Sequence, residues 1–261
     1  MTEFQEKSTV TARESLAGDV FRLTVQAPRI AAAAQPGQFV MVRTGDTLDP
    51  LLRRPLSIHQ VLSDGRLRLL FKVVGKGTGL LAGLGPGRKI DLIGPLGRGF
   101  SLAPAGPACL VGGGMGMAPL YFLARRLLQV RPGPGDDQIL LVARNRAELE
   151  LPAAEFSGLG YRLHLATDDG SLGHHGLVPE LLDDVLPSVR QVYVCGPYPM
   201  MRTVALKCRT AGVACQVSLE THMACGLGVC LGCAVAVAAG GYKHVCKDGP
   251  VFAADEVLWK M

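Results

Sequence analysis

The first hundred residues alternate short apolar or β-branched runs with turn residues and lack long helical periodicity. Pro36-Gly37, Ser63-Asp64-Gly65 and Pro86-Gly87 separate these runs. Runs bounded in this way predict β-strands, and six at this spacing predict a small closed antiparallel barrel. The predicted strands are Ser8–Ala12, Val20–Ala27, Gln38–Arg43, Leu56–Val61, Arg66–Val74 and Lys89–Ile93.

The pattern changes after a predicted linker flanked by Pro104 and Pro107. Apolar runs of strand length now alternate with segments of helical period, which predicts a parallel sheet wound on both faces by helices. The first helix has Leu120, Leu123 and Leu127 on one face. Strands are expected at Ala108–Val111, Ile139–Ala143, Arg162–Ala166, Val192–Cys195 and Cys215–Leu219, and later helices at Leu177–Leu186 and Pro199–Ala211.

Length and composition are consistent with two domains and a small appendage. The chain has 261 residues, of which 48% are apolar and 19% charged, so a substantial core is expected. The net charge of +5 is scattered and does not favour nucleic-acid binding. We expect neither an export signal nor a membrane span, because the start is polar and the uncharged run Gly99 to Ala124 contains three prolines. A cytoplasmic location would keep the eight cysteines reduced.

Four cysteines near the C-terminus have the spacing C-x4-C-x2-C, followed by a fourth after twelve residues. They are Cys225, Cys230, Cys233 and Cys246. Plant-type ferredoxins use this spacing to hold a 2Fe–2S cluster with four thiolates. Gly226, Gly228 and Gly232 suit a loop that needs positive φ and close approach of its backbone to sulfur. The spacing favours the cluster over structural zinc, a disulfide or unreactive buried thiols.

Two stretches of the predicted barrel could bind phosphate. Arg53-Arg54-Pro55-Leu56-Ser57 begins a strand with cations that can grip a pyrophosphate. Gly75-Lys76-Gly77-Thr78-Gly79 precedes a helical turn, where backbone N–H groups can cradle an anion. Either stretch alone is more typical of an ordinary barrel with a surface arginine and a glycine-rich turn.

A third glycine-rich stretch joins a predicted strand to a predicted helix. The segment 112–119 contains Gly112, Gly113, Gly114 and Gly116, and this arrangement favours a dinucleotide at the helix N-terminus. Cys195-Gly196-Pro197 ends another strand, where open α/β sheets bind ligands, although Cys195 could simply be a small buried residue. Asp168 and Asp169 follow the third strand of the sheet; a ribose contact that favours NAD over NADP and a solvated turn explain them equally well.

The histidines add little. His59, His174 and His175 are expected at the surface rather than as ligands. His222 and His244 lie near the cluster cysteines, but a Rieske-type pair would replace two thiolates and four are already present.

The first part of the chain resembles the flavin domain of the ferredoxin-reductase superfamily. The resemblance rests on the strand motif Arg54-Pro55-Leu56-Ser57 and the turn Gly77-Thr78, with Leu56 standing where many members have tyrosine. It implies that both motifs hold FAD and that Leu70-Phe71-Lys72 lies on the next flavin-contacting strand. It also implies that Cys195-Gly196-Pro197 borders the nicotinamide and that 112–119 holds the dinucleotide.

The order of flavin domain, nucleotide domain and short cluster-bearing cap is similar to the family of dihydroorotate dehydrogenase B electron-transfer subunits. Supporting stretches are 52–58, 94–97, 166–170, 195–197, 220–225 and 242–252. The resemblance implies limits of 1–103 for the FAD barrel, 104–218 for the NAD domain and 219–261 for the cap.

That family implies a partner. An FMN-containing catalytic subunit would oxidise dihydroorotate in pyrimidine biosynthesis, in a heterotetramer with two copies of each chain. Electrons would pass through the 2Fe–2S cluster and FAD to NAD+, and no residue of this chain would act as a general acid or base. Met223, Leu227 and Val229 could contact the partner, or merely pack the cap.

Other functions stay open at this point. They are a flavin subunit of a sulfhydrogenase or of an NADH-dependent ferredoxin:NADP oxidoreductase, a free-standing NADH reductase serving an oxygenase, and a zinc-stabilised binding module without redox activity.

Overall fold

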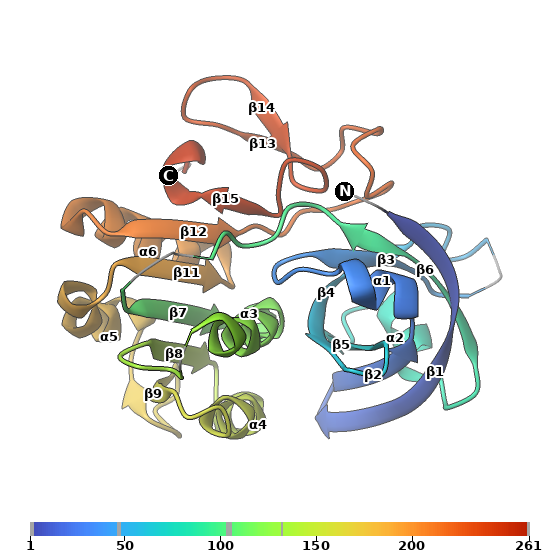
Figure 1. Ribbon diagram of the computed structural model, residues 1–261, viewed down its shortest axis with the longest axis horizontal. Helices are drawn as coiled ribbons and strands as arrows, with labels where there is room; N and C mark the ends of the chain where they lie inside the picture. The colour runs from blue at the N-terminus through green and yellow to red at the C-terminus, as the bar shows by residue number, and fades with distance from the viewer. Residues whose placement is uncertain (1–2, 46–47, 103–105, 132, 260–261) are drawn as a thin grey trace.

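The computed structural model describes residues 3–45, 48–102, 106–131 and 133–259. Figure 1 shows a barrel beside a layered α/β unit, with the C-terminal segment lying over both. Pro104 and the predicted boundary at 103/104 lie outside the described residues, so the limits of the three parts remain a prediction.

Six antiparallel strands close into a barrel in the order β1-β2-β5-β4-β3-β6, as predicted. They are β1 (Phe4–Ala17), β2 (Val20–Gln26), β3 (Phe39–Arg43), β4 (Arg54–Val61), β5 (Arg66–Lys72) and β6 (Lys89–Leu96); the short helices α1 (Pro28–Ala33) and α2 (Lys76–Ala82) lie in the connections. Side chains alternate between the two faces of each strand. On β5, Leu67, Leu69 and Phe71 fill the core, whereas Leu70 and Lys72 face outward.

Strand β1 is much longer than the predicted Ser8–Ala12. Its first half pairs with β6 and its second half with β2, so one strand serves two neighbours. The outward residues of β1 are polar and it has few apolar residues. The hydrophobic pattern therefore predicts only the middle of the strand.

The α/β unit contains a seven-stranded sheet in the order β10-β9-β8-β7-β11-β12-β15. Neighbours are parallel except β15, which runs antiparallel to β12. The strands are β7 (Ala108–Gly113), β8 (Gln138–Ala143), β9 (Arg162–Thr167), β10 (His174–His175), β11 (Gln191–Cys195), β12 (Ala214–Ser218) and β15 (Val251–Ala253). Apart from β10 and β15, these are the strands that the sequence predicts.

Helices cover both faces of this sheet. They are α3 (Met117–Val130), α4 (Arg146–Ser157), α5 (Val178–Val185) and α6 (Tyr198–Ala211), with short 3-10 turns at Gly114–Gly116, Leu186–Ser188 and Ala254–Glu256. Successive residues of β7 take opposite sides: Leu110 packs with α3 and α4, and Val111 packs with α5 and α6. Burial on both faces explains why these strands read as continuous apolar runs.

The sequence does not predict helix α4. It contains Pro152, which removes a backbone donor, and its apolar positions form no clear stripe. Asn145 caps its first turn by accepting a hydrogen bond from the Glu148 N–H at 3.1 Å. An asparagine followed three residues later by a glutamate is the sequence feature that could have predicted the start of this helix.

The C-terminal segment is not an independent lobe. After the hairpin β13 (Ala234–Ala236) and β14 (Tyr242–His244), β15 returns to the sheet and pairs Phe252 with Val217. Cys233 and Cys246 belong to the same buried cluster as Met41 and Leu96 of the barrel. No helix within the described ranges is long and apolar enough to cross a membrane.

Candidate functional site

The four cysteines of the predicted cluster motif lie in the C-terminal segment beside the barrel and the sheet, although no three or more His, Cys, Asp or Glu side chains among the described residues are arranged to hold a metal ion. Their sulfurs form two pairs. Cys233 Sγ lies 3.2 Å from Cys246 Sγ, and the Cys225 and Cys230 side chains are hydrogen-bonded to one another. A 2Fe–2S cluster with four cysteine ligands takes two thiolates at each of its two irons, so two pairs fit its donor set.

Backbone N–H groups point at these sulfurs. Leu227 N–H donates to Cys225 Sγ at 3.3 Å, and Gly228 N–H donates to Cys246 Sγ at 3.1 Å. Gly226 and Gly228 have φ of +74° and +78°, as the sequence predicts. For Gly232 the expected positive φ is wrong, and Leu231 takes that conformation instead with φ of +61°. Gly232 does lie close to sulfur, because a Cβ there would be 3.7 Å from Cys230 Sγ.

The thiols differ in acidity. Burial opposes ionisation of Cys225, but hydrogen bonds from the backbone N–H groups of Cys230, Leu227 and Val229 outweigh it and lower its pKa to about 6. Burial and the adjacent Cys233 thiol raise the pKa of Cys246 to about 12. The lowered pKa of Cys225 favours its thiolate, the form that binds iron. A cation between Cys233 and Cys246 would remove the repulsion between two neighbouring thiolates.

The cluster loop rests on the barrel. A Cβ at Gly226 would lie 2.4 Å from Met41 Cγ, so only glycine leaves room for this contact. In the β3–β4 ladder, Met41 pairs with Pro55 of the predicted flavin motif. The cysteine loop therefore lies one strand away from that motif.

The two predicted phosphate stretches meet at one place. A Cβ at Gly77 would lie 2.6 Å from Arg54 Nε, which puts the guanidinium against the first turn of α2. Arg54 also donates from one terminal nitrogen to the Leu52 carbonyl at 2.6 Å, which fixes its side chain beside the turn.

Thr78 shapes this turn. Its hydroxyl accepts from the backbone N–H of Val74 at 3.0 Å and Gly75 at 3.3 Å, and donates to the Gly75 carbonyl at 3.1 Å. The backbone N–H groups, rather than this hydroxyl, are then the groups left for a phosphate.

The remaining residues of the predicted flavin motif separate by strand alternation. Leu56 packs inside the barrel, whereas Ser57 is half-buried on the opposite face of β4. Phe71 also fills the barrel core, so only Leu70 and Lys72 of the predicted stretch face outward.

A cavity of about 490 Å³ lies between the barrel and the sheet. Gly113, Gly114, Pro197, Leu70 and Lys72 line it. It sits at the C-terminal ends of the parallel strands, beside the point between β7 and β11 where the strand order reverses. Ligands of open α/β sheets bind at such a switch point.

The other predicted nucleotide-site residues pack beneath this cavity. A Cβ at Gly116 would lie 2.2 Å from the Cys195 carbonyl oxygen, and one at Gly196 would lie 2.6 Å from Met200 Cε. Gly112 is enclosed by Leu120 and Leu141 side chains. These glycines let two loops interlock. Gly113 and Gly114 both line the cavity, but only Gly114 is exposed.

Two nucleotide-site predictions left alternatives open. Cys195 is buried, and burial raises the pKa of its thiol above the usual range. Asp168 lines the cavity, whereas Asp169 accepts from the Ser171 N–H at 2.9 Å within the turn. The turn explains Asp169, whereas a ribose contact of Asp168 stays a prediction.

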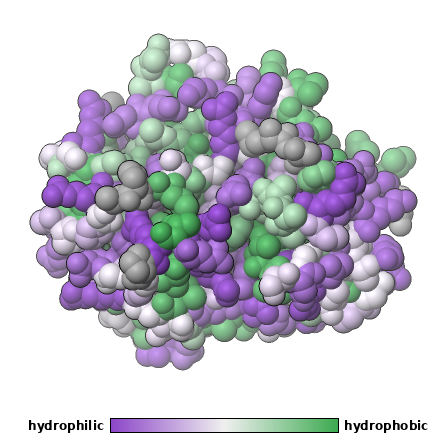
Figure 2. Space-filling model, in the orientation of Figure 1, coloured by the Kyte–Doolittle hydropathy of each residue, from purple (hydrophilic) through white to green (hydrophobic). Residues whose placement is uncertain are grey.

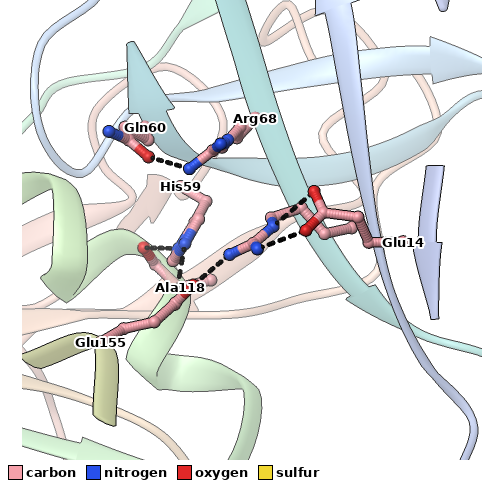
Figure 3. A network of polar contacts seen from close by, with 7 residues as sticks. Glu14, His59, Gln60, Arg68, Ala118 and Glu155 are labelled. Atoms are coloured by element: carbon pink, nitrogen blue, oxygen red, sulfur yellow. Dashed lines mark hydrogen bonds and ion pairs between the residues drawn. The ribbon is translucent and has the colours of Figure 1, made fainter. Parts of the chain in front are cut away.

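The expectation for His59 is wrong. Its side chain is buried where β4 meets α3, inside a polar network that joins the barrel to the α/β unit (Figure 3). Strand β4 has both faces covered, so a histidine on it need not mark a surface. His174 and His175 are exposed, as expected.

Sequence reasoning missed the α4 residues that face the cavity. Glu148 bonds to Lys72 Nζ at 3.2 Å, and Glu155 pairs with Arg22 of β2, so two ion pairs bridge the barrel and α4 across the cavity wall. The sequence analysis could not place these two glutamates because it did not predict helix α4.

Two family models match this chain. Residues 7–100 match the oxidoreductase FAD-binding domain, and residues 220–258 match the iron-sulfur cluster binding domain of dihydroorotate dehydrogenase B. The second match contains all four cysteines of the motif, and it favours the cluster over structural zinc.

Similar proteins extend over the whole chain. The electron transfer subunit of dihydroorotate dehydrogenase B (NAD(+)) from Desulforamulus reducens is 42% identical over 258 residues, covering 96% of this chain and 97% of the relative. The subunit of that name from Geobacillus thermodenitrificans is 41% identical over 260 residues, covering 97% and 98%.

Solved structures share the fold. The structure of an NADH-dependent reduced ferredoxin-NADP oxidoreductase has a TM-score of 0.84 and 32% identity, covering 97% of this chain and 90% of that one. The ferredoxin reductase of carbazole 1,9a-dioxygenase has a TM-score of 0.67 at 20% identity, covering 82% and 67%.

Proposed function

The chain belongs to the family of dihydroorotate dehydrogenase B electron transfer subunits, and we propose that it carries electrons from a dihydroorotate-oxidising partner to NAD+ in pyrimidine biosynthesis. It is a flavin- and iron–sulfur-containing oxidoreductase subunit, with FAD, a 2Fe–2S cluster and NAD as its cofactors. FAD, when bound, exchanges a hydride with NAD and single electrons with the cluster, which couples the two kinds of transfer.

The chain's own residues bind and orient these groups. Arg54 and the first turn of α2 hold the FAD pyrophosphate, with Ser57, Leu70 and Lys72 on the same outer face of the barrel. Gly113, Gly114 and Pro197 present their backbone to the dinucleotide, and Asp168 accepts from its ribose. Cys225, Cys230, Cys233 and Cys246 hold the cluster.

One observation carries this proposal: the contact of Gly226 with Met41. Met41 of β3 pairs with Pro55 of β4, and adjacent strands lie about 4.8 Å apart, so the cluster loop packs on the strand next to the flavin motif. This adjacency supports direct electron transfer between the two groups.

The partner would be an FMN-containing catalytic subunit, with two copies of each chain in the complex. Leu227, Val229 and Leu231 are exposed around the cysteines, and Figure 2 shows hydrophobic residues on this upper edge of the molecule. Met223, in contrast, packs against the buried cluster shared by the sheet and the cap, which favours a packing role. We place the docking face at the cluster loop. We place the complex in the cytoplasm, because the free cysteines stay reduced there.

The test is reconstitution of the pair. The isolated chain, loaded with FAD and cluster, should reduce artificial acceptors with NADH but should not oxidise dihydroorotate. Addition of the catalytic subunit from the same genome should create NAD+-dependent dihydroorotate oxidation. Turnover of dihydroorotate by the isolated chain, or no coupling between two fully loaded subunits, would contradict the proposal.

A second function is favoured by the 32% identity with the NADH-dependent ferredoxin-NADP oxidoreductase structure. In that case the chain would serve a different redox partner through the same face. Copurification from the native host distinguishes the two, because the identity of the bound subunit names the complex.

A further inference from the structure

His59 is enclosed at the contact between the barrel and helix α3. It lies on β4, two residues beyond Ser57, and its side chain is only 2% exposed. Its ring stacks on Tyr121 of α3, with centroids 4.7 Å apart and an interplanar angle of 18°. Its Nδ1 lies 3.2 Å from the Ala118 carbonyl oxygen. A carbonyl can only accept, so Nδ1 carries the proton and donates.

The other ring nitrogen faces helix α4. His59 Nε2 lies 3.5 Å from Glu155 Oε2, a contact that is an ion pair only when both ring nitrogens carry a proton, and the second oxygen of Glu155 pairs with Arg22. Arg22 is held in turn by Glu14, with contacts of 3.1 Å and 2.6 Å (Figure 3). His59 therefore contacts two helices of the α/β unit while its backbone remains in a barrel strand.

Each of these elements carries part of the binding machinery. Strand β4 bears Arg54 and Ser57 just before His59. Helix α3 follows directly on the glycine loop 112–116, and Ala118 lies in its first turn. Glu155 lines the cavity together with Gly113 and Gly114. The contacts of His59 thus fix the spacing between the flavin strand and the nucleotide loop.

We propose that His59 is a positioning residue for hydride transfer, and this inference rests on the proposed function. In the transfer, NADH loses a hydride, two electrons with one proton, and becomes NAD+. FAD receives the hydride, takes one further proton from water and becomes FADH2. The reacting atoms must approach to about 3–3.5 Å, and a misplacement of about 1 Å can cost on the order of 100-fold in rate.

Two substitutions separate the roles of the ring. His59→Phe keeps the ring that stacks on Tyr121 but removes the N–H that bonds to Ala118. His59→Asn loses the ring but keeps an amide donor near the position of Nδ1. His164→Asn is the matched control, because His164 bonds to Gln138 at 2.8 Å entirely within the sheet.

The measurement is rapid-mixing reduction of bound FAD by NADH. His59→Phe should slow reduction at saturating NADH by about 10- to 100-fold while the KM for NADH changes less than about threefold. His59→Asn should recover most of the rate, and His164→Asn should match the wild type. Equal rates for wild type and His59→Phe, or loss in KM alone, would overturn the inference.

Hydrogen exchange supplies a readout that needs no turnover. In His59→Phe, amides in the first turns of α3, around residues 118–122, should exchange faster, while those at 124–130 remain unchanged. The same change in exchange rate along all of α3 would contradict the positioning role of His59. If His59→Phe does not bind FAD, Glu155→Gln tests the contact between His59 and α4 instead. We expect slower FAD reduction at an unchanged KM for NADH. An unchanged rate would contradict the inference. A wild type that NADH cannot reduce would instead refute the proposed function.

Discussion

The guanidinium of Arg54 packs against Gly77, so that a Cβ at Gly77 would lie 2.6 Å from Arg54 Nε. Arg54 begins strand β4 and Gly77 lies in the first turn of helix α2. The contact places a fixed cation beside unpaired backbone N–H groups at a helix start. Two motifs that are weak evidence separately lie together in the structure, which supports the proposed phosphate site.

Replacing Arg54 with alanine should weaken FAD binding. Loss of a charge-assisted contact costs about 1.5–3 kcal/mol, or roughly tenfold or more in affinity. Fluorescence titration of the apoprotein with FAD measures the change. Arg66→Ala is the control, because Arg66 pairs with Asp64 in an exposed turn of the same barrel. Equal affinity in Arg54→Ala and wild type would place the phosphate elsewhere.

Replacing Cys230 with serine should remove the cluster. Anaerobically purified wild type should contain about two irons and two acid-labile sulfides per chain. Cys215→Ser, in strand β12 and outside the motif, should keep both. Metal analysis and the visible spectrum decide the outcome, and stoichiometric zinc without iron in the wild type would refute the cluster.

Replacing Gly226 with alanine should strain the cluster loop. The residue has φ of +74°, and the new Cβ would lie 2.4 Å from Met41 Cγ. A non-glycine residue in this conformation costs about 1–3 kcal/mol, and the collision adds to it. We expect a lower melting temperature and less iron per chain. Gly232→Ala is the control, because the atom nearest to a Cβ at Gly232 would be Cys230 Sγ, at an ordinary contact distance of 3.7 Å. Equal losses in both variants would show that the loop tolerates no change at all, and that the Met41 contact is not the cause.

The ion pairs of Glu148 with Arg144 and Lys72 should make stability depend on pH. A hydrogen bond from Arg144, opposed by burial and helped by Lys72, lowers the pKa of Glu148 to about 2. The unfolded value is about 4.3, so the stabilisation is present above that pH and is lost as the pH falls toward 2. The difference in unfolding free energy between wild type and Glu148→Gln, measured with denaturant, should therefore shrink between pH 5 and about 2. A difference that is constant over this range would contradict the ionic role.

The exposed apolar residues of the cluster loop should matter only in the complex. Val229→Asp places a charge on a side chain that is 77% exposed. We expect weaker binding of the catalytic subunit and slower NAD+-dependent dihydroorotate oxidation, with NADH oxidation by artificial acceptors and iron content unchanged. Leu206→Asp, on helix α6, is the control surface substitution. Equal partner affinity in both variants would move the docking face away from the cluster loop.

Local patterns in the chain are enough to predict the barrel, the parallel sheet and the cluster. Strand period, turn residues and strand–helix alternation act over a few residues, so the barrel and the parallel sheet follow from local pattern. The four cysteines carry their own spacing, and a ligand set of this kind needs little help from the rest of the chain to be recognised.

How these parts meet depends on long-range contacts that local pattern does not reveal. Helix α4 is held by its Asn145 cap and by packing of Leu149 and Phe156 on the sheet, against the effect of Pro152. His59 is buried because β4 is covered by α3, and β15 joins the sheet because the end of the chain folds back to β12. These outcomes depend on contacts between residues far apart in sequence, and such contacts leave no period in the chain. The cavity and the spacing between the cluster loop and the flavin strand arise from those same contacts.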